Sequence, residues 1–232
     1  MKVLEIDQNT EEWEEFRKGK SGGSAFYKMF KIGGRSNGAI NDYFFKMLAE
    51  RIARPMAPND YMDRVPEGVP FSWAVRGHIL EEDAAKMFAE RYHKKLKPGY
   101  VWMSGYDENS YISPDRAIVN TQGNIREAVE IKCLSSEKVL KIWYERMNME
   151  PEECDFDILP SEYQSQVLKY FMVNEGLKKL YWVLYTDLIP GLEMQVLEVN
   201  KEDVRPFLDQ AVAVEKSWLE ELKKSEKMLE NS

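Results

Sequence analysis

Three acidic residues occupy positions where an ordinary folded segment favours other side chains: Glu81 in a helical pattern, and Asp115 and Glu130 in strand patterns. Lys132 follows two positions after the last of them. Carboxylate oxygens of this kind hold Mg²⁺ or Mn²⁺ together with water and substrate phosphate. Such an ion lowers the pKa of a bound water and stabilises the attacking and leaving oxygens of a phosphodiester. A lysine beside it can orient the water and offset developing negative charge. The four residues therefore predict metal-dependent hydrolysis of phosphodiester bonds.

Glu81 belongs to the segment GHILEEDAAKMFAERY, which has the spacing of an amphipathic helix. With about 100° between successive residues, the positions within about 60° of Glu81 are Gly77, Ala84, Ala85, Phe88 and Tyr92. Glu81 is therefore predicted to lie on the apolar, core-facing side, where an uncompensated charge is costly. A bound cation would compensate it. A partner arginine, backbone amides or a slightly rotated helix are the alternatives.

Asp115 lies in ISPDRAIV, an otherwise apolar strand pattern in which aspartate is disfavoured. Pro114 indicates an edge position, a bulge or a bent strand at this point. The alternative is a turn, because Ser-Pro-Asp is also a turn sequence.

Glu130 and Lys132 lie in EAVEIKCL, where alternation places both side chains on one face of a strand. The other face is then filled by Val129, Ile131 and Cys133. An exposed Glu-x-Lys pair is common on sheets. The pair is significant because another strand carries Asp115 and a helix presents Glu81.

The order of the predicted elements defines the fold class. Helical patterns cover 10–18, 24–31, 37–54, 73–93, 136–147, 161–175 and 201–227. Thr10 is the expected N-cap of the first helix, and Pro55 ends the third. Strand patterns cover 100–104, 111–119, 126–134, 180–185 and 192–199, the first three as successive strands. We predict a mixed α/β (α+β) fold with a central mixed sheet of about five strands, flanked by helices.

The length of 232 residues suits one sizeable core. We therefore expect a single domain over 1–232. Within it, N-terminal helices would cover 10–54, a proline-rich surface loop 55–70, a catalytic core 72–200 and a closing helix 201–227.

Composition narrows the classes of function. The net charge of −8 argues against a nucleic-acid partner when taken alone, but catalytic carboxylates contribute to it and basic residues are bunched near Arg17, Lys28 and Lys94. Two cysteines are too few for a disulfide scaffold or a cysteine-based iron–sulfur or zinc site. No apolar run is long enough to cross a bilayer, and the acidic, amphipathic N-terminus is unlike a signal peptide. An intracellular protein without a membrane partner is expected.

Several segments together resemble a known family. Pro114-Asp115 followed by Glu130-Ile131-Lys132 resembles the loose motif of the PD-(D/E)xK nuclease superfamily. The chain is more closely similar to the lambda exonuclease and YqaJ-type viral recombinase family. The matching blocks are EEWEEFRKGKSGGS, GHILEEDAA, SPD with EIKC, and YQSQVLKYFMV, in family order between about residues 10 and 185. The resemblance implies a PD-(D/E)xK nuclease-like core.

The resemblance also implies roles for the residues at the metal. Glu81, Asp115 and Glu130 would bind it, with the Ile131 carbonyl as an extra ligand. Lys132 would position the attacking water.

Other matching residues would act on either side of the metal. Gln166 would support the site from the following helix, and Arg17 and Ser24 would hold the 5′-phosphate end of DNA. Backbone amides over 22–24 suit an anion independently of the resemblance.

Three departures from the family pattern stand in the sequence. Arg116 follows SPD where the family usually has glycine, the turn over 120–125 is extended, and Leu168 replaces a second glutamine. None removes a ligand. The resemblance does not indicate how DNA would approach the site past Arg116.

The function implied is that of a Mg²⁺- or Mn²⁺-dependent exonuclease, with one or two ions, acting 5′→3′ on double-stranded DNA ends in phage-type homologous recombination. The resemblance further implies a homo-oligomer (a trimeric ring), a single-strand annealing protein as partner, and the cytoplasm of a phage-infected or prophage-bearing bacterium. An end-binding pocket at Arg17 and Ser24 favours an exonuclease over an endonuclease of the same superfamily. A catalytically silent module that binds DNA or protein is the other alternative, against which the intact Asp115, Glu130 and Lys132 argue.

Overall fold

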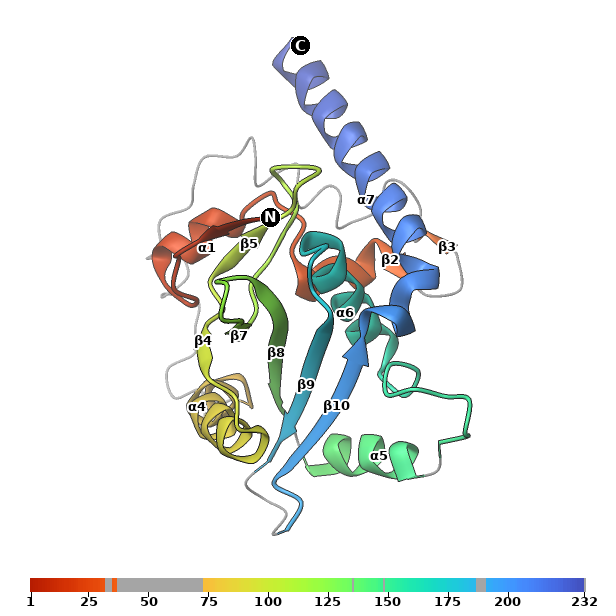
Figure 1. The fold of residues 1–232 in the computed structure, drawn as a ribbon. Helices are drawn as coiled ribbons and strands as arrows, with labels where there is room; N and C mark the ends of the chain where they lie inside the picture. Colours follow the sequence, from red (N-terminus) through yellow and green to blue (C-terminus); the bar gives the residue numbers. More distant parts are fainter. Residues whose placement is uncertain (32–34, 37–72, 135, 148, 187–190, 232) are drawn as a thin grey trace, which may run out of the picture.

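The computed structural model describes residues 1–31, 35–36, 73–134, 136–147, 149–186 and 191–231 (Figure 1). The helix predicted over 37–54 and the loop predicted over 55–70 lie outside these residues. None of the described helices is long and apolar enough to span a membrane.

A five-stranded mixed sheet forms the centre of the protein. Its strands are β4 (Leu96–Pro98), β7 (Arg116–Val119), β8 (Ile125–Cys133), β9 (Lys179–Tyr185) and β10 (Met194–Asn200), in the spatial order β10-β9-β8-β7-β4. Strands β8 and β9 pair in parallel, and the other neighbours pair antiparallel. The parallel pair needs a long crossover, which α5 (Ser136–Met147) and α6 (Ser161–Val173) provide. The predicted mixed sheet flanked by helices is confirmed.

Helices cover both faces of this sheet, as Figure 1 shows. Helix α4 (Trp73–Tyr92) packs on one face, where its Phe88 meets Val129 and Ile131 of β8. Helix α6 packs on the other face, where Ala128 of β8 lies in the larger core with Tyr170. The alternation predicted for β8 is therefore present, because odd-numbered and even-numbered side chains enter different cores. The Glu130 face is the face that α6 covers.

The strand predicted over 111–119 is wrong as a single element. It is divided into β6 (Tyr111–Ile112) and β7, which belong to different sheets. Pro114 explains the break, because it has no backbone N–H to donate within a strand ladder. A Cβ at Gly99 would lie 1.8 Å from the Pro114 carbonyl oxygen, so only glycine lets the two chain segments pass here.

The first three predicted strands therefore do not form one sheet, although each pairs with the next. Strand β5 (Val101–Met103) pairs with β6 and with β1 (Lys2–Leu4) in a separate three-stranded sheet. The short strands β1 and β4 were not predicted. Strand β1 pairs with a segment about a hundred residues away, which no local pattern reveals.

The N-terminal helices differ in part from prediction. Helix α1 (Glu11–Arg17) begins at the expected cap, where the Thr10 hydroxyl accepts a hydrogen bond from the Trp13 amide. The α-helix predicted over 24–31 is instead a 3-10 helix, η1 (Gly23–Lys28). A Cβ at Gly23 would lie 1.8 Å from Ile112 Cδ1, so the segment packs closely against β6 at its first residue.

The remaining elements are short or peripheral. Strands β2 (Phe30–Lys31) and β3 (Arg35–Ser36) form a two-stranded ribbon after η1. Helix α7 (Lys201–Glu230) begins at an Asn200–Asp203 capping box and ends three residues later than predicted. Its first half packs against α6, and its end extends beyond the rest of the protein in Figure 1.

Candidate active site

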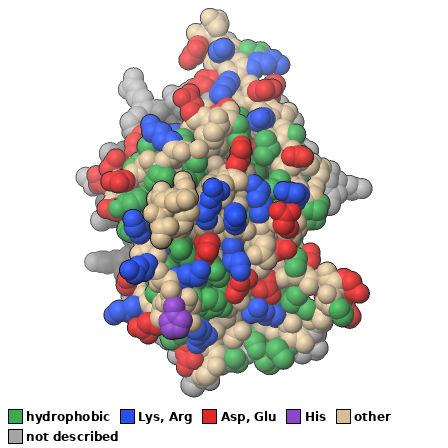
Figure 2. Space-filling model, in the orientation of Figure 1, with side chains coloured by type: hydrophobic (Ala, Val, Ile, Leu, Met, Phe, Trp, Pro, Cys, Tyr) green, Lys and Arg blue, Asp and Glu red, His purple; other side chains and the backbone are tan. Residues whose placement is uncertain are grey.

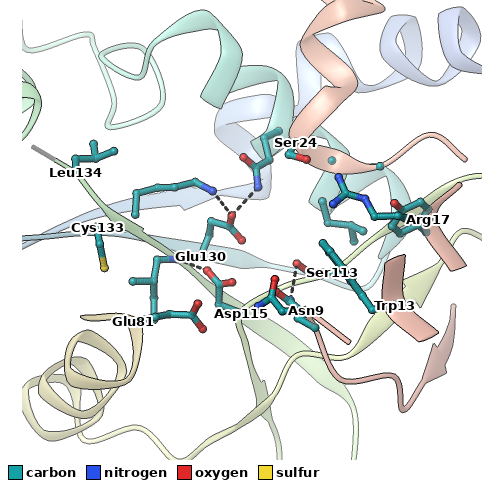
Figure 3. A pocket seen from close by; sticks show the side chains of 18 residues that line it. Asn9, Trp13, Arg17, Ser24, Glu81, Ser113, Asp115, Glu130, Cys133 and Leu134 are labelled. Atoms are coloured by element: carbon teal, nitrogen blue, oxygen red, sulfur yellow. Dashed lines mark hydrogen bonds and ion pairs between the residues drawn. The ribbon is translucent and has the colours of Figure 1, made fainter. Parts of the chain in front are cut away.

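One pocket of about 430 Å³ contains every residue that the sequence predicted for the site. The predicted residues that line it are Arg17, Ser24, Glu81, Asp115, Glu130, Ile131, Lys132 and Gln166. They come from α1, η1, α4, the β6–β7 break, β8 and α6. In Figure 3 the carboxylates of Glu81, Asp115 and Glu130 follow one another along one side, and Arg17 and Ser24 lie on the other.

Glu130 is the most enclosed of the three acids, at 4% exposed. Its Oε1 accepts hydrogen bonds from Lys132 Nζ and Gln166 Nε2, each at 2.6 Å. Its Oε2 accepts one from the Tyr170 hydroxyl. Charge-assisted hydrogen bonds of this kind are strong and directional. The carboxylate is therefore fixed from β8 and α6 together.

Tyr170 also contacts the site, through Glu130, and was not among the residues predicted from the sequence. It is fully buried, and its pKa is raised well above the ordinary value by burial and by the nearby Glu130 and Asp115. It therefore stays a neutral hydrogen-bond donor. The signal was its spacing of four residues from Gln166, which places both on one side of α6.

Lys132 lies on the same strand face as Glu130, as predicted. Burial disfavours its charged form, but Glu130 and Asp115 outweigh burial and raise its pKa. The ammonium also lies 5.3 Å from the centre of the Trp182 ring. Lys132 therefore places a positive charge at the wall of the pocket, in a position fixed by its neighbours.

Asp115 stands in the break between β6 and β7, half-buried. Its Oδ2 accepts a hydrogen bond of 2.6 Å from the Ile131 amide. The N–H and C=O of one strand residue point to the same neighbour, so the Ile131 carbonyl also faces the Asp115 side. The pKa of Asp115 is raised well above its usual value by burial and by Glu130 and Glu81, against the opposing effect of Lys132. Negative charge is thus concentrated here.

Glu81 projects from the core-facing side of α4, with 24% of its side chain exposed. Its Oε1 accepts a 3.0 Å hydrogen bond from Arg116 Nη1, so the partner arginine considered from the sequence is present. Arg116 also donates to Glu82 at 2.6 Å and to the Asp115 carbonyl at 2.8 Å. Arg116, for which the resemblance led us to expect glycine, therefore points toward α4.

The three carboxylates do not share a ready-made metal centre. Across the residues whose positions are described, no group of three or more acidic, histidine or cysteine side chains is arranged to hold an ion directly. Each acid is engaged by its own donors: Arg116 for Glu81, the Ile131 amide for Asp115, and Lys132 with Gln166 for Glu130. The oxygen-rich donor set and the raised pKa of Asp115 fit a hard divalent cation. To bind such a cation, Glu81 would have to give up its hydrogen bond with Arg116.

The opposite wall of the pocket is basic and aromatic. The Arg17 guanidinium lies 4.4 Å from the centre of the Trp13 ring, and Trp13 donates to the Ser113 hydroxyl at 3.2 Å. Trp13 and Ser113 line the pocket but were not predicted as site residues. Ser24 is exposed at the start of η1. This wall suits a phosphate group.

Basic side chains continue beyond this wall. A neighbouring pocket of about 450 Å³ is lined by Arg17, Lys18, Lys20 and Lys28, among others. Figure 2 likewise shows Lys and Arg side chains gathered over the middle of the visible face. The net charge of −8 is therefore not spread evenly, and local positive potential is available to a polyanion.

Comparisons with known proteins identify the family of the chain and its fold. The sequence matches the YqaJ-like viral recombinase domain over residues 12–176. A comparison with curated proteins finds no match. The structure is similar to an alkaline exonuclease, LHK-Exo from Laribacter hongkongensis, with a TM-score of 0.70, 16% identity, and 96% of this chain and 97% of that chain covered.

Two further solved structures are similar in fold. LHK-Exo in complex with dAMP gives a TM-score of 0.68 at 18% identity, with 96% of this chain and 97% of that chain covered. A phage related exonuclease from Haemophilus somnus 129PT gives 0.52 at 11% identity, with 89% and 96% covered. The fold is therefore shared with these exonuclease structures.

Proposed function

Because the chain belongs to the YqaJ-like viral recombinase domain family, we propose that it is a Mg²⁺- or Mn²⁺-dependent exonuclease that degrades double-stranded DNA from its 5′ ends. The proposal depends on one observation: the same pocket has carboxylates along one wall and Arg17 with Ser24 on the other. This arrangement suits a scissile phosphate beside an anchored terminal phosphate.

The chain's own residues would divide the work as follows. Glu81, Asp115, Glu130 and the Ile131 carbonyl would hold the ion, which when bound supplies Lewis-acid stabilisation and a more acidic water. Gln166 keeps the Glu130 carboxylate turned into the pocket. A positive Lys132 offsets charge that develops on the phosphoryl oxygens and orients the attacking water.

Selection of a 5′ end would belong to the opposite wall. A terminal phosphate carries more charge than an internal one, so a fixed guanidinium distinguishes the two. Arg17 is held against Trp13, and Ser24 adds a hydroxyl beside the backbone at Gly22 and Gly23. Such a pocket binds a strand end and makes no additional contact with an uninterrupted duplex.

Digestion of matched substrates tests the proposal. With Mg²⁺, linear duplex DNA should be degraded, a covalently closed circle should survive, and a label near the 5′ end should be released before one near the 3′ end. EDTA should stop the reaction. Cutting of the circle would make the protein an endonuclease. No activity on any substrate, with binding retained, would make it the silent DNA-binding module.

A second prediction concerns Arg17→Ala. The variant is expected to lose about tenfold in its preference for a 5′-phosphorylated over a 5′-hydroxyl end, because one charge-assisted contact is removed. Competition between the two linear substrates in one reaction measures the ratio. Lys18→Ala, on the adjacent residue, is the control. An unchanged ratio in Arg17→Ala would assign end selection to other residues.

We propose that the protein assembles as a homo-oligomer, works with a single-strand annealing protein in homologous recombination, and acts in the cytoplasm of a phage-infected or prophage-bearing bacterium. None of these enters the chemistry of the pocket.

A further inference from the structure

A buried ion pair lies behind the pocket, outside the catalytic set. Lys169 of α6 and Glu215 of α7 are both 0% exposed, and their charged groups are in contact. Lys169 Nζ also donates to the Ser110 hydroxyl at 2.7 Å and to the Ser21 hydroxyl at 3.4 Å. Tyr106 donates to the Glu215 carboxylate and accepts from Ser110 at 2.9 Å.

This cluster reaches the phosphate wall through Ser21. The Ser21 amide donates to the Asn109 carbonyl at 2.8 Å, and the Tyr111 amide donates to the Ser21 carbonyl at 3.1 Å. Ser21 immediately precedes Gly22, Gly23 and Ser24, which line the pocket. The loop that would receive the phosphate therefore starts from an anchored residue.

Helix α6 connects this anchor with the catalytic carboxylate. Gln166, Lys169 and Tyr170 are separated by three and four residues, which places them on neighbouring positions of one helix side. Gln166 and Tyr170 hold Glu130, whereas Lys169 holds the Ser21–Ser110 bridge. One helix thus sets the position of both walls of the pocket.

A buried ion pair is weak evidence for added stability. Replacing a buried ion pair with apolar residues of similar size is often neutral or stabilising, because desolvation opposes the attraction. Burial lowers the pKa of Lys169 even though Glu215 counteracts it. Lys169 lies on the helix whose Gln166 and Tyr170 hold Glu130, and it contacts the Ser21–Ser110 bridge before the phosphate wall, which points to a role in geometry.

We propose that Lys169 is a positioning residue, which with Glu215 holds the 21–24 loop at a fixed separation from Glu130. The inference rests on the proposed function, because its consequence concerns DNA cleavage. A 5′ phosphate anchored on the loop places the scissile bond at the carboxylates. Without the pair, the loop can still bind a phosphate but no longer in register with the metal site.

The test replaces both charges, so that neither is left buried alone. The double variant Lys169→Met/Glu215→Leu is compared with Lys179→Met/Glu198→Leu, which removes an ion pair between β9 and β10 outside the pocket. Thermal melting should change by no more than about 3 °C in either. The ratio of kcat/KM for 5′-phosphoryl over 5′-hydroxyl ends should fall about fivefold only in the first. Amide hydrogen exchange over residues 20–25 should become faster only in the first.

Each outcome decides one of the two proposals. An unchanged ratio with unchanged exchange overturns the positioning role. Faster exchange over 20–25 in a protein whose wild type degrades no DNA supports the positioning role and overturns the nuclease. If the double variant does not fold, Ser110→Ala replaces it. This variant keeps the ion pair and removes one anchor, and a ratio equal to that of the wild type would overturn the role.

Discussion

Lys132→Ala is expected to slow strand hydrolysis by about 10³-fold at saturating Mg²⁺, within the range of losses when a positioned charge or proton-transfer group is removed. The pKa of Lys132 is raised by Glu130 and Asp115 despite burial, so the wild type presents a positive charge at the pocket wall. Alanine removes that charge where the phosphoryl oxygens become more negative. Single-turnover digestion of an end-labelled duplex measures the loss without interference from product release.

The fold should tolerate this substitution. Lys132 is 23% exposed in its side chain, and Glu130 keeps its hydrogen bonds to Gln166 and Tyr170 when the lysine is gone. A melting temperature close to that of the wild type would show that the loss is chemical. Lys179→Ala is the matched control, since Lys179 is also a strand lysine paired with a glutamate but lies outside the pocket. A loss below about tenfold in Lys132→Ala would remove Lys132 from the chemistry.

Local periodicity predicted the carboxylates because each lies in a regular element with a clear apolar side. Glu81 could be placed from the helical repeat of α4, and Glu130 with Lys132 from the alternation of β8. Both patterns depend only on neighbours within a few residues. The side of the helix or strand on which each residue lies could therefore be predicted from the sequence.

Residues that act through distant partners could not be predicted in this way. Tyr170 follows the helical stripe of the core, and only the fold shows that its hydroxyl meets Glu130. The role of Arg116 depends on Glu81, thirty-five residues earlier. Lys169 and Glu215 each look like ordinary helix residues, and their burial becomes visible only when α6 and α7 are packed together.

The break at Asp115 shows a different limit. Its strand pattern and its turn pattern were both present in ISPDRAIV, and the structure has a break with a bend at Asp115 between two strands. Pro114 and the close approach of Gly99 decide between them. That approach joins two separate stretches of the chain, so the local sequence alone left both patterns open.

Asp115→Asn is expected to abolish detectable hydrolysis and, without metal, to raise the melting temperature by about 3 °C, an amount that corresponds to about 1 kcal/mol for a chain of this size. Burial, Glu130 and Glu81 raise the pKa of Asp115, so ionising this carboxyl in the folded protein is unfavourable. Asparagine removes the charge and keeps an oxygen that can accept from the Ile131 amide. Melting in EDTA measures the gain.

The sign of the pH dependence follows from the direction of the shift. A group with a raised folded-state pKa binds its proton more tightly in the folded than in the unfolded chain, so its contribution to stability is lost as pH rises past the unfolded value. The difference in melting temperature between Asp115→Asn and wild type should therefore be small near pH 4 and grow toward pH 8. Mn²⁺ should raise the melting temperature of the wild type and leave that of the variant almost unchanged.

Asp107→Asn is the control with the opposite sign. Burial opposes its ionisation, but hydrogen bonds from Lys223 and the Asn109 amide outweigh burial and lower the pKa of Asp107. Removing that charge should lower the melting temperature at neutral pH and leave the Mn²⁺ effect intact. Equal behaviour of the two variants would mean that Asp115 lies in no special electrostatic environment. The pocket would then lack the concentrated negative charge that makes a divalent cation favourable there.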